Sequence, residues 1–131
     1  CRVCTVFNVS NVCICLTKVV VLARSEAEVT SLAAEIKGLA IVADVTDSSQ
    51  VRRAFEKIIE TYGSVDVCIN NAGQAVSAPL SETDDESWTQ MMTCNLGGAF
   101  FCSREALKAM KAPGRTGGVI VNVGSSCVDG S

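Results

Sequence analysis

From position 18 onward the chain alternates short apolar runs with amphipathic stretches of helical spacing. The apolar runs are rich in valine and isoleucine, which is typical of strands buried on both faces of a sheet. Four such strands are expected, at positions 19–22, 39–43, 65–69 and 119–123. Strands that alternate with helices form βαβ units. The pattern therefore predicts the α/β class, with a Rossmann-like, doubly wound parallel sheet.

The first two helices carry clear start and stop signals. Each begins at a polar residue with Glu or Gln three positions later, which is the capping-box pattern of a helix start. These pairs are Ser25 with Glu28 and Asp47 with Gln50. Gly38 and Gly63 are expected to end the two helices, because glycine adopts the left-handed conformation that terminates a helix.

A longer third helix is expected from the polar stretch 81–86 to Met110. Its apolar residues recur near one helical face, which predicts a stripe that packs on other elements. The members of this stripe are Trp88, Met91, Met92, Leu96, Ala99 and Phe100.

The first 17 residues differ from the rest of the chain. They contain no glycine, and no helical stripe separates them from the strand at 19–22, although Val12, Ile14 and Leu16 alternate like a strand. We therefore expect an atypical, cysteine-rich segment at 1–17 and a partial Rossmann-like domain at 18–131. The alternative places a first strand at 3–6, but the helix that should follow it then has no room.

Composition narrows the function classes. The chain has 11 basic and 14 acidic residues, which argues against a nucleic-acid partner. It has no histidine, so a His-based catalytic triad and a His-ligated metal site are excluded. No stretch has the length and apolar character of a membrane span, so no membrane partner is expected.

Eight cysteines are many for 131 residues. Four lie in the first 17 residues, and Cys68, Cys94, Cys102 and Cys127 are scattered through predicted strands, helices and a loop, which favours buried, reduced thiols in a cytoplasmic protein over a disulfide framework. The early C-x2-C and C-x-C spacings could suggest zinc, but apolar neighbours and the lack of a second C-x2-C pair argue against a metal site.

In a parallel sheet, ligands bind beyond the carboxyl ends of the strands, and four motifs lie at such positions. Asn70-Asn71-Ala72-Gly73 follows one strand, and Asp44-Val45 follows the strand before it. Asn95 lies in the long helix, and the last strand leads into Gly124-Ser125-Ser126. In this order and spacing, the motifs resemble those of the classical short-chain dehydrogenase/reductase family, over about four-fifths of the chain.

The resemblance implies an oxidoreductase that moves a hydride between a nicotinamide cofactor and a carbonyl or alcohol. It implies that Ser125, selected over Ser126 by its spacing from the strand asparagine, binds the substrate oxygen, and that Asn95 orders a water in a proton relay. Asp44 and Val45 would contact the adenine, while Asn71, Ala72 and Gly73 would line the cofactor site. Full-length relatives are expected to form homo-oligomers, with Cys102, Leu107 and Met110 on the shared surface.

The residues that follow the strand at 19–22 bear on the choice between NAD and NADP. Family members that prefer NAD resemble one another in an acidic residue at the position of Ala23. Here Arg24 could pair with a 2′-phosphate and Ser25 could add a hydrogen bond, which favours NADP(H) over NAD(H). A solvated arginine in a loop is the alternative interpretation.

The sequence departs from the family in two places. The glycine-rich loop that follows the family's first strand is missing, and the first glycine of this chain is Gly38. The family's Tyr-x-x-x-Lys is also missing, since the single tyrosine, Tyr62, has no lysine four residues later. We therefore expect a fragment truncated at both ends that lacks the central first strand and is inactive alone.

Two other functions stay open at this point. A non-catalytic chain could keep the fold as a binding or dimerisation partner of an intact homologue. Another nucleotide-binding α/β enzyme, such as a methyltransferase, is disfavoured by the Asn-Asn-Ala-Gly turn and the serine after the last strand. The loop 74–81 is expected to border the substrate, but its small residues do not identify it.

Overall fold

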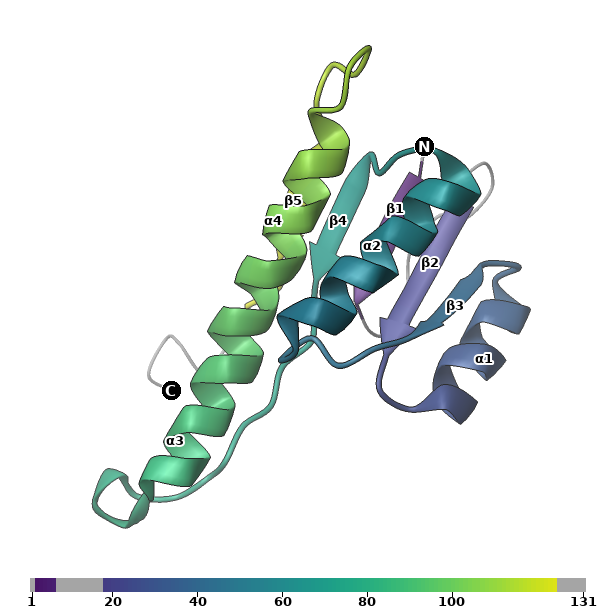
Figure 1. The fold of residues 1–131 in the computed structure, drawn as a ribbon. Helices are drawn as coiled ribbons and strands as arrows, with labels where there is room; N and C mark the ends of the chain where they lie inside the picture. Colours follow the sequence, from purple (N-terminus) through teal and green to yellow (C-terminus); the bar gives the residue numbers. More distant parts are fainter. Residues whose placement is uncertain (1, 7–17, 125–131) are drawn as a thin grey trace.

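The computed structural model describes residues 2–6 and 18–124 of the chain. Within these ranges five parallel strands form one sheet in the order β3-β2-β1-β4-β5. Figure 1 shows the twisted sheet with its helices. The strands are β1 (Arg2–Val6), β2 (Lys18–Ala23), β3 (Leu39–Val42), β4 (Val67–Asn70) and β5 (Val119–Asn122). The α/β class and the parallel sheet predicted from the hydrophobic pattern are confirmed.

Strand β1 lies at the centre of the sheet, between β2 and β4. Its residue Val3 is in register with Val19 on one side and with Val67 on the other. The expectation that the chain lacks the central first strand was wrong, and the start of the domain at position 18 is corrected accordingly. The pattern was misleading because only the 11 positions 7–17 separate β1 from β2, and they contain no helical stripe.

Two helices start as their capping residues predict. In α1 (Glu26–Glu35), Ser25 Oγ accepts from the N–H of Glu28 at 3.5 Å. In α2 (Ser48–Tyr62), Asp47 Oδ1 accepts from the N–H groups of Ser49 and Gln50, and these bonds hold the pKa of Asp47 far below its usual value. Helix α2 ends at Gly63, whose φ of 78° is left-handed.

The third helix has the predicted extent but is less regular than the sequence predicts. A 3-10 turn, η1 (Leu80–Glu82), precedes α3 (Asp85–Met92). A π-helical segment, η2 (Thr93–Gly98), then joins α3 to α4 (Ala99–Met110), and the three form one rod in Figure 1. Asp84 caps the rod by accepting from the N–H of Ser87 at 2.6 Å.

The apolar stripe expected on this rod points the wrong way. Four of its six members are exposed, namely Trp88, Met92, Leu96 and Phe100. The buried side of the rod is instead formed by smaller residues at intervals of four and by the last turn, namely Cys94, Gly98, Cys102, Ala106, Ala109 and Met110. Of the residues expected on an oligomer surface, Cys102 and Met110 are therefore in the core and only Leu107 is exposed.

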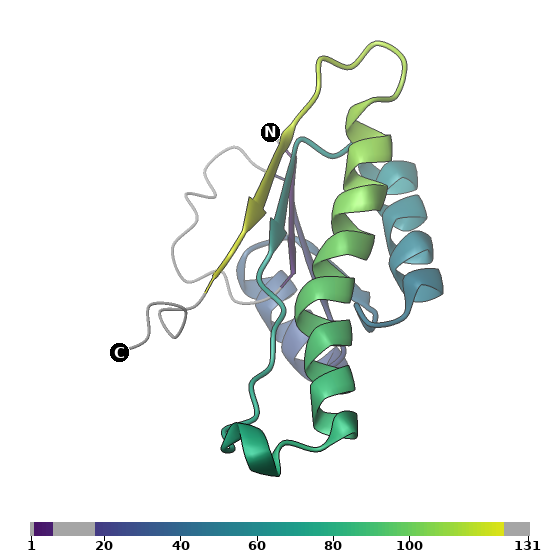
Figure 2. The same cartoon turned by 90° about the vertical axis from the view of Figure 1, so that its left-hand side faces the viewer.

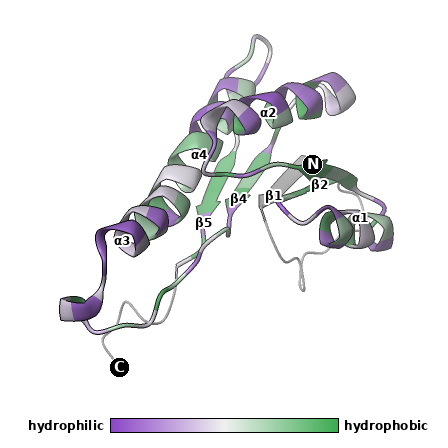
Figure 3. Ribbon diagram, turned by 60° about the horizontal axis from the view of Figure 1, so that its bottom comes forward, coloured by the Kyte–Doolittle hydropathy of each residue, from purple (hydrophilic) through white to green (hydrophobic). Residues whose placement is uncertain are grey.

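The helices cover the sheet from both sides (Figure 2). Helix α1 packs on β2 and β3 at one face, while α2 and α4 pack together at the other. Alternate residues of β2 serve the two layers: Val21 joins the α1 side, and Val20 and Leu22 join the larger core. Figure 3 shows the apolar strands between helices of mixed polarity. Val119, Val121 and Val123 remain exposed on the edge strand and the residue after it.

Cysteines Cys68, Cys94 and Cys102 are free and buried, as the sequence predicts. Burial raises the pKa of Cys68 and of Cys102 to about 12, so both are neutral thiols at physiological pH. The side chains of the other five cysteines lie outside the described part. Across residues 2–6 and 18–124, no cluster of potential metal ligands occurs, and no helix has the length and apolar character needed to cross a membrane.

Candidate functional site

A cleft runs along the carboxyl ends of the strands, where the topology predicts a ligand. It consists of three adjoining recesses of about 300, 470 and 230 Å³. We name them the Asp44 recess, the Asn95 recess and the Thr93 recess after one residue in each. The first two share Asn71, Ala72 and Gly73, so one elongated ligand can extend across both.

The turn after β3 holds the Asp44 carboxylate in place. Asp44 Oδ1 accepts from the N–H and the hydroxyl of Thr46, at 2.9 and 2.7 Å. The N–H of Asp44 donates to Gln50 Oε1 at 3.0 Å. In a capping box, the Gln50 side chain would accept from the backbone N–H of Asp47. Here it accepts from the N–H of Asp44 instead and so holds the turn after β3. Since Thr46 occupies Oδ1, the other oxygen, Oδ2, is left to accept from a ligand at the recess.

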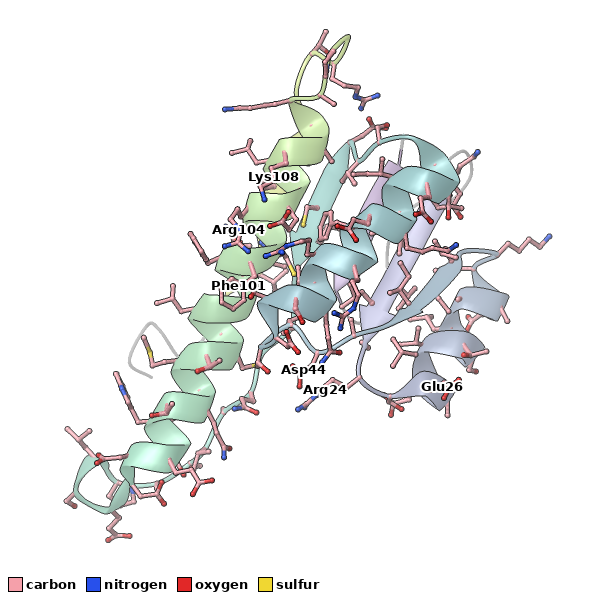
Figure 4. All side chains as sticks on the ribbon, in the orientation of Figure 1. Arg24, Glu26, Asp44, Phe101, Arg104 and Lys108 are labelled. Carbon is pink, nitrogen blue, oxygen red and sulfur yellow. The ribbon has the colours of Figure 1, made fainter. Side chains whose placement is uncertain are left out.

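Arg24 lies across the mouth of the Asp44 recess (Figure 4). Its Nη1 is 4.0 Å from Asp44 Oδ2, and 69% of the Arg24 side chain is exposed. An ion pair so long and so exposed contributes little stability, so the guanidinium can turn toward an anionic ligand at small cost.

The rest of the Asp44 recess is lined mostly by small residues. The lining comprises Ala23, Ala43, Val45, Asn71, Ala72 and Gly73, together with Cys94 from the π segment. Burial raises the pKa of Cys94, with Arg24 opposing and Asp44 reinforcing the effect, so the thiol is protonated and uncharged. A flat, uncharged ring with polar edges suits such a lining beside one carboxylate.

In the Asn95 recess, the Asn95 carboxamide holds the loop after β4. Asn95 Oδ1 accepts from the N–H of Gln74 at 2.8 Å, and Asn95 Nδ2 donates to the carbonyl of Gln74 at 2.9 Å. A methyl group on Gly73 would lie 3.4 Å from Asn95 Oδ1, so glycine lets loop and helix approach closely. Val123 and Gly124, after β5, form the opposite wall.

A buried amide lies beneath the two recesses. Asn70 Nδ2 donates to Ser103 Oγ and to Asn122 Oδ1, both at 2.8 Å, and is 3.4 Å from the Ala99 carbonyl. Asn70 is in register with Asn122 across β4 and β5. The network therefore ties both strand ends to helix α4, which continues the rod that bears Asn95.

The cleft brings together most of the residues that the sequence singles out. Arg24, Asp44 and Val45 gather with Asn71, Ala72 and Gly73 in the Asp44 recess, and Asn95 faces the adjoining one. Ser25 lines none of the three recesses and caps α1. Ser125 lies outside the described residues.

Sequence reasoning missed the roles of three residues that shape the cleft: Thr46, Gln50 and Cys94. A hydroxyl two residues after an aspartate commonly donates to its carboxylate, so the signal for Thr46 was available. The roles of Gln50 and Cys94 depend on contacts between elements.

A larger recess lies elsewhere, between α1 and β2, at about 620 Å³. Aliphatic side chains such as Val21 and Leu32 line it with Glu28 and Glu35 on α1, and none of the described lining residues is positively charged. The chemistry therefore favours the smaller cleft at the strand ends.

Comparisons with known proteins agree on one family. The profile of the family described as short chain dehydrogenase matches residues 16–129. The chain is 41% identical over 90 residues to a 3beta-hydroxysteroid dehydrogenase of Mediterraneibacter gnavus, covering 68% of this chain and 32% of that protein. It is 43% identical over 88 residues to chanoclavine-I dehydrogenase of Aspergillus fumigatus, covering 63% and 34%. The chain thus spans about a third of these relatives.

Solved structures give the same result. A short-chain dehydrogenase from Streptomyces avermitilis superposes with a TM-score of 0.80 at 26% identity, over 95% of this chain and 49% of that one. An actinorhodin polyketide ketoreductase variant, solved with NADPH, superposes with a TM-score of 0.78 at 31% identity, over 83% and 44%.

Proposed function

The chain belongs to the short-chain dehydrogenase/reductase family, and we propose that it functions as an NAD(P)-dependent oxidoreductase. The proposed reaction transfers a hydride between a nicotinamide cofactor and a carbonyl or alcohol substrate. The observation that carries the proposal is the continuous cleft from Arg24 and Asp44 to Asn95 along the strand ends. The adenosine half of the cofactor occupies the Asp44 recess, and the nicotinamide half extends to the Asn95 recess.

The chain's own residues bind and orient the cofactor. Asp44 Oδ2 accepts from the amino group of the adenine, while Val45 and Ala72 contact the ring. Asn71 to Gly73 form the wall that the two halves share. When bound, the nicotinamide supplies or accepts the hydride.

Asn95 and Ser125 act on the substrate side of the proposal. Asn95 uses its carboxamide to hold the carbonyl and N–H of Gln74, which sets the loop that borders the substrate. In this proposal a relay water binds at the π segment that carries Asn95. Ser125 donates a hydrogen bond to the substrate oxygen.

We propose that the site prefers NADP(H) to NAD(H), because of the position of Arg24. The guanidinium is exposed and is held only by a 4.0 Å ion pair to Asp44. A 2′-phosphate at the mouth of the recess offers it a stronger, charge-assisted partner. Ser25, next to Arg24, can add a hydroxyl hydrogen bond to the same phosphate.

Isothermal titration calorimetry of the 131-residue chain with NADPH and with NADH tests this proposal. NADPH should bind more tightly, and Arg24→Ala should weaken NADPH binding about tenfold while changing NADH binding little. The matched control is Arg52→Ala, which removes the same charge from an exposed position on α2. Equal affinity for both cofactors would refute the NADP preference, and no binding of either would refute the cofactor site.

The 131 residues by themselves are proposed to turn over slowly or not at all. The single tyrosine, Tyr62, is at the end of α2, where the Lys18 ammonium lies 5.2 Å from its ring centroid. Lys18 is the first residue of β2, so this pair lies at the amino ends of the strands, whereas the cleft lies at their carboxyl ends. Tyr62 cannot reach a substrate there. NADPH oxidation with a panel of small ketones and aldehydes should stay near background, and ordinary enzyme rates would contradict the proposal.

A specific observation favours a second function, as a partner for another copy of the same chain. Large apolar side chains are exposed along the rod at intervals of mostly four residues: Trp88, Met92, Leu96, Phe100 and Leu107. Such a row resembles the apolar face of a helix that packs on another helix. The proposed oligomer pairs this row with its equivalent in a second copy.

Sedimentation velocity tests the oligomer proposal. Leu96→Glu should shift a dimer to monomer, because it puts a charge in the middle of the row. Leu80→Glu is the matched control, since Leu80 is the most exposed large apolar residue and lies outside the rod. A wild-type chain that stays monomeric at high concentration would contradict the oligomer.

A further inference from the structure

Gly98, at the end of the π segment, packs directly against the turn that carries Asp44 and Val45. A Cβ atom built on Gly98 would lie 2.8 Å from Val45 Cγ2 and 3.1 Å from Val45 Cβ. Separations under 3.0 Å do not occur between real side-chain carbons, so a side chain at position 98 would require Val45 or the helix to move.

Val45 has little freedom to move away from such a side chain. It is 7% exposed and belongs to the main hydrophobic core. Its own carbonyl oxygen would also be 3.6 Å from the added Cβ, so the backbone of the turn lies on the helix as well. Val45 lines the Asp44 recess, which gives it an open volume on that side.

The π segment contributes to this recess in two ways. Its buried residues are Cys94 and Gly98, one above the other on the inner side of the rod. Cys94 forms part of the wall of the Asp44 recess, and Gly98 lies behind Val45. The depth of the recess therefore depends on a residue that does not line it.

We propose that Gly98 is a positioning residue that sets the adenine-binding depth of the Asp44 recess by allowing Val45 to withdraw toward the helix. The inference rests on the proposed cofactor function. The group admitted is the flat base of an adenine nucleotide, because small side chains such as Ala23, Ala43 and Ala72 leave a shallow space beside one carboxylate oxygen of Asp44. A methyl group at position 98 would drive Val45 into the place of the base.

The test measures binding of 5′-AMP and of NADPH to the full chain by calorimetry, beside thermal unfolding. Gly98→Ala should weaken binding of both ligands about tenfold, since displacing a wall by a fraction of an ångström removes contact over a whole ring. Gly97→Ala is the matched control. A Cβ there meets nothing closer than 3.8 Å, so its binding should match the wild type within about twofold.

The double variant Gly98→Ala with Val45→Ala provides the rescue. Removing the Val45 γ-methyl groups abolishes the 2.8 Å contact and leaves the 3.1 Å contact with Cβ, which needs a smaller shift, so the double variant should fold and bind AMP more tightly than Gly98→Ala. A general loss of helix stability would not be repaired by shortening Val45. If Gly98→Ala alone does not fold, recovery of folding and AMP binding by the double variant carries the same information.

The outcomes separate this inference from the function beneath it. A wild-type chain that binds neither AMP nor NADPH overturns both. A wild-type chain that binds them, with Gly98→Ala as tight as Gly97→Ala, overturns only the role of Gly98. A binding loss in Gly98→Ala that Val45→Ala does not relieve shows that Gly98 acts by another route, and also overturns it.

Discussion

Asn95 and Gln74 are 21 residues apart, yet the carboxamide of one binds both backbone groups of the other, at 2.8 and 2.9 Å. A carboxamide is the only side chain of this size that can accept and donate at once in this geometry. The position of the loop after β4 is therefore set by the π segment of the rod.

Asn95→Asp should release this loop. The aspartate still accepts from the N–H of Gln74, but it cannot donate to the Gln74 carbonyl and places a negative charge against it. We expect faster hydrogen exchange at the Gln74 amide, by about tenfold, with a small loss of global stability. Gln90→Glu on α3 is the control, because it makes the same charge change on an exposed side chain. Unchanged exchange at Gln74 would mean that other contacts hold the loop.

The Asn70 amide should prove sensitive to charge. Asn70→Asp replaces a donor by a carboxylate that faces Ser103 Oγ, Asn122 Oδ1 and the Ala99 carbonyl. A buried charge among acceptors is strongly unfavourable, so we expect a loss of about 3 kcal/mol in the free energy of unfolding by urea. Ser103→Ala removes one acceptor alone and should cost about 1 kcal/mol. Equal losses would show that the network does not depend on the amide donor.

The Glu105 carboxylate predicts a pH dependence. Burial acts to raise its pKa, but hydrogen bonds from Lys108 and Arg104, at 2.9 to 3.0 Å, outweigh burial and lower the pKa below 4.5. Its stabilising contribution is therefore present above the unfolded-state pKa and is lost as the pH falls through the folded-state pKa. Glu105→Gln should cost about 1 kcal/mol at pH 7 and progressively less below about pH 4.5.

The control for that experiment is Glu56→Gln, which changes an exposed glutamate on α2. Its effect on the free energy of unfolding should be small and flat with pH. A Glu105→Gln difference that stays constant down to pH 3 would contradict the role assigned to the ionised carboxylate.

Arg115 and Asp66 form an ion pair that joins the loop before β5 to the residue before β4. The N–H of Val119 also donates to the Asp66 carbonyl at 2.9 Å. Arg115 Nε is buried without a hydrogen-bond partner, so part of this pair's benefit is offset. Arg115→Ala should cost about 1 kcal/mol, and Arg115→Lys less, because lysine keeps the charge and lacks that buried N–H. A lysine variant less stable than the alanine variant would contradict this account.

Local signals predicted the parts of the fold that depend on neighbours in sequence. Ser25 and Asp47 cap the helices they were expected to cap, and Gly63 ends α2 in the left-handed conformation. The resemblance also directed attention to the strand ends, where Arg24, Asp44 and Asn95 now line adjoining recesses.

The features that failed depend on distant partners. The central place of β1 follows from its pairing with β2 and β4, which no local pattern in Arg2–Val6 indicates. The Gln50 side chain accepts from Asp44 because the turn after β3 lies beside it. The packing of Gly98 on Val45 requires the rod to be placed first. The role of Ser125 and the preference for NADP stay predictions.

The π-helical segment Thr93–Gly98 contributes to the misassignment of the stripe on the rod. The inward residues Cys94, Gly98, Cys102, Ala106 and Met110 recur every four positions. In a regular α-helix each such step overshoots a full turn by about 40°. The π segment takes up this excess only in the step from Cys94 to Gly98, so a period of 3.6 residues fitted along the whole rod misplaces the residues before that step relative to those after it.

The same turn has a consequence for how this stretch of the gene can change length. Loss of one codon between positions 93 and 98 would leave the hydrogen-bonded ladder continuous, because a π turn without its extra residue is an ordinary α turn. Because the wider turn takes up the extra residue, its removal would keep everything on the amino side of the deletion close to its present angle around the rod. Deletions here should thus be neutral for helix content, as circular dichroism would report it, and should leave Trp88 and Met92 on the same side of the molecule.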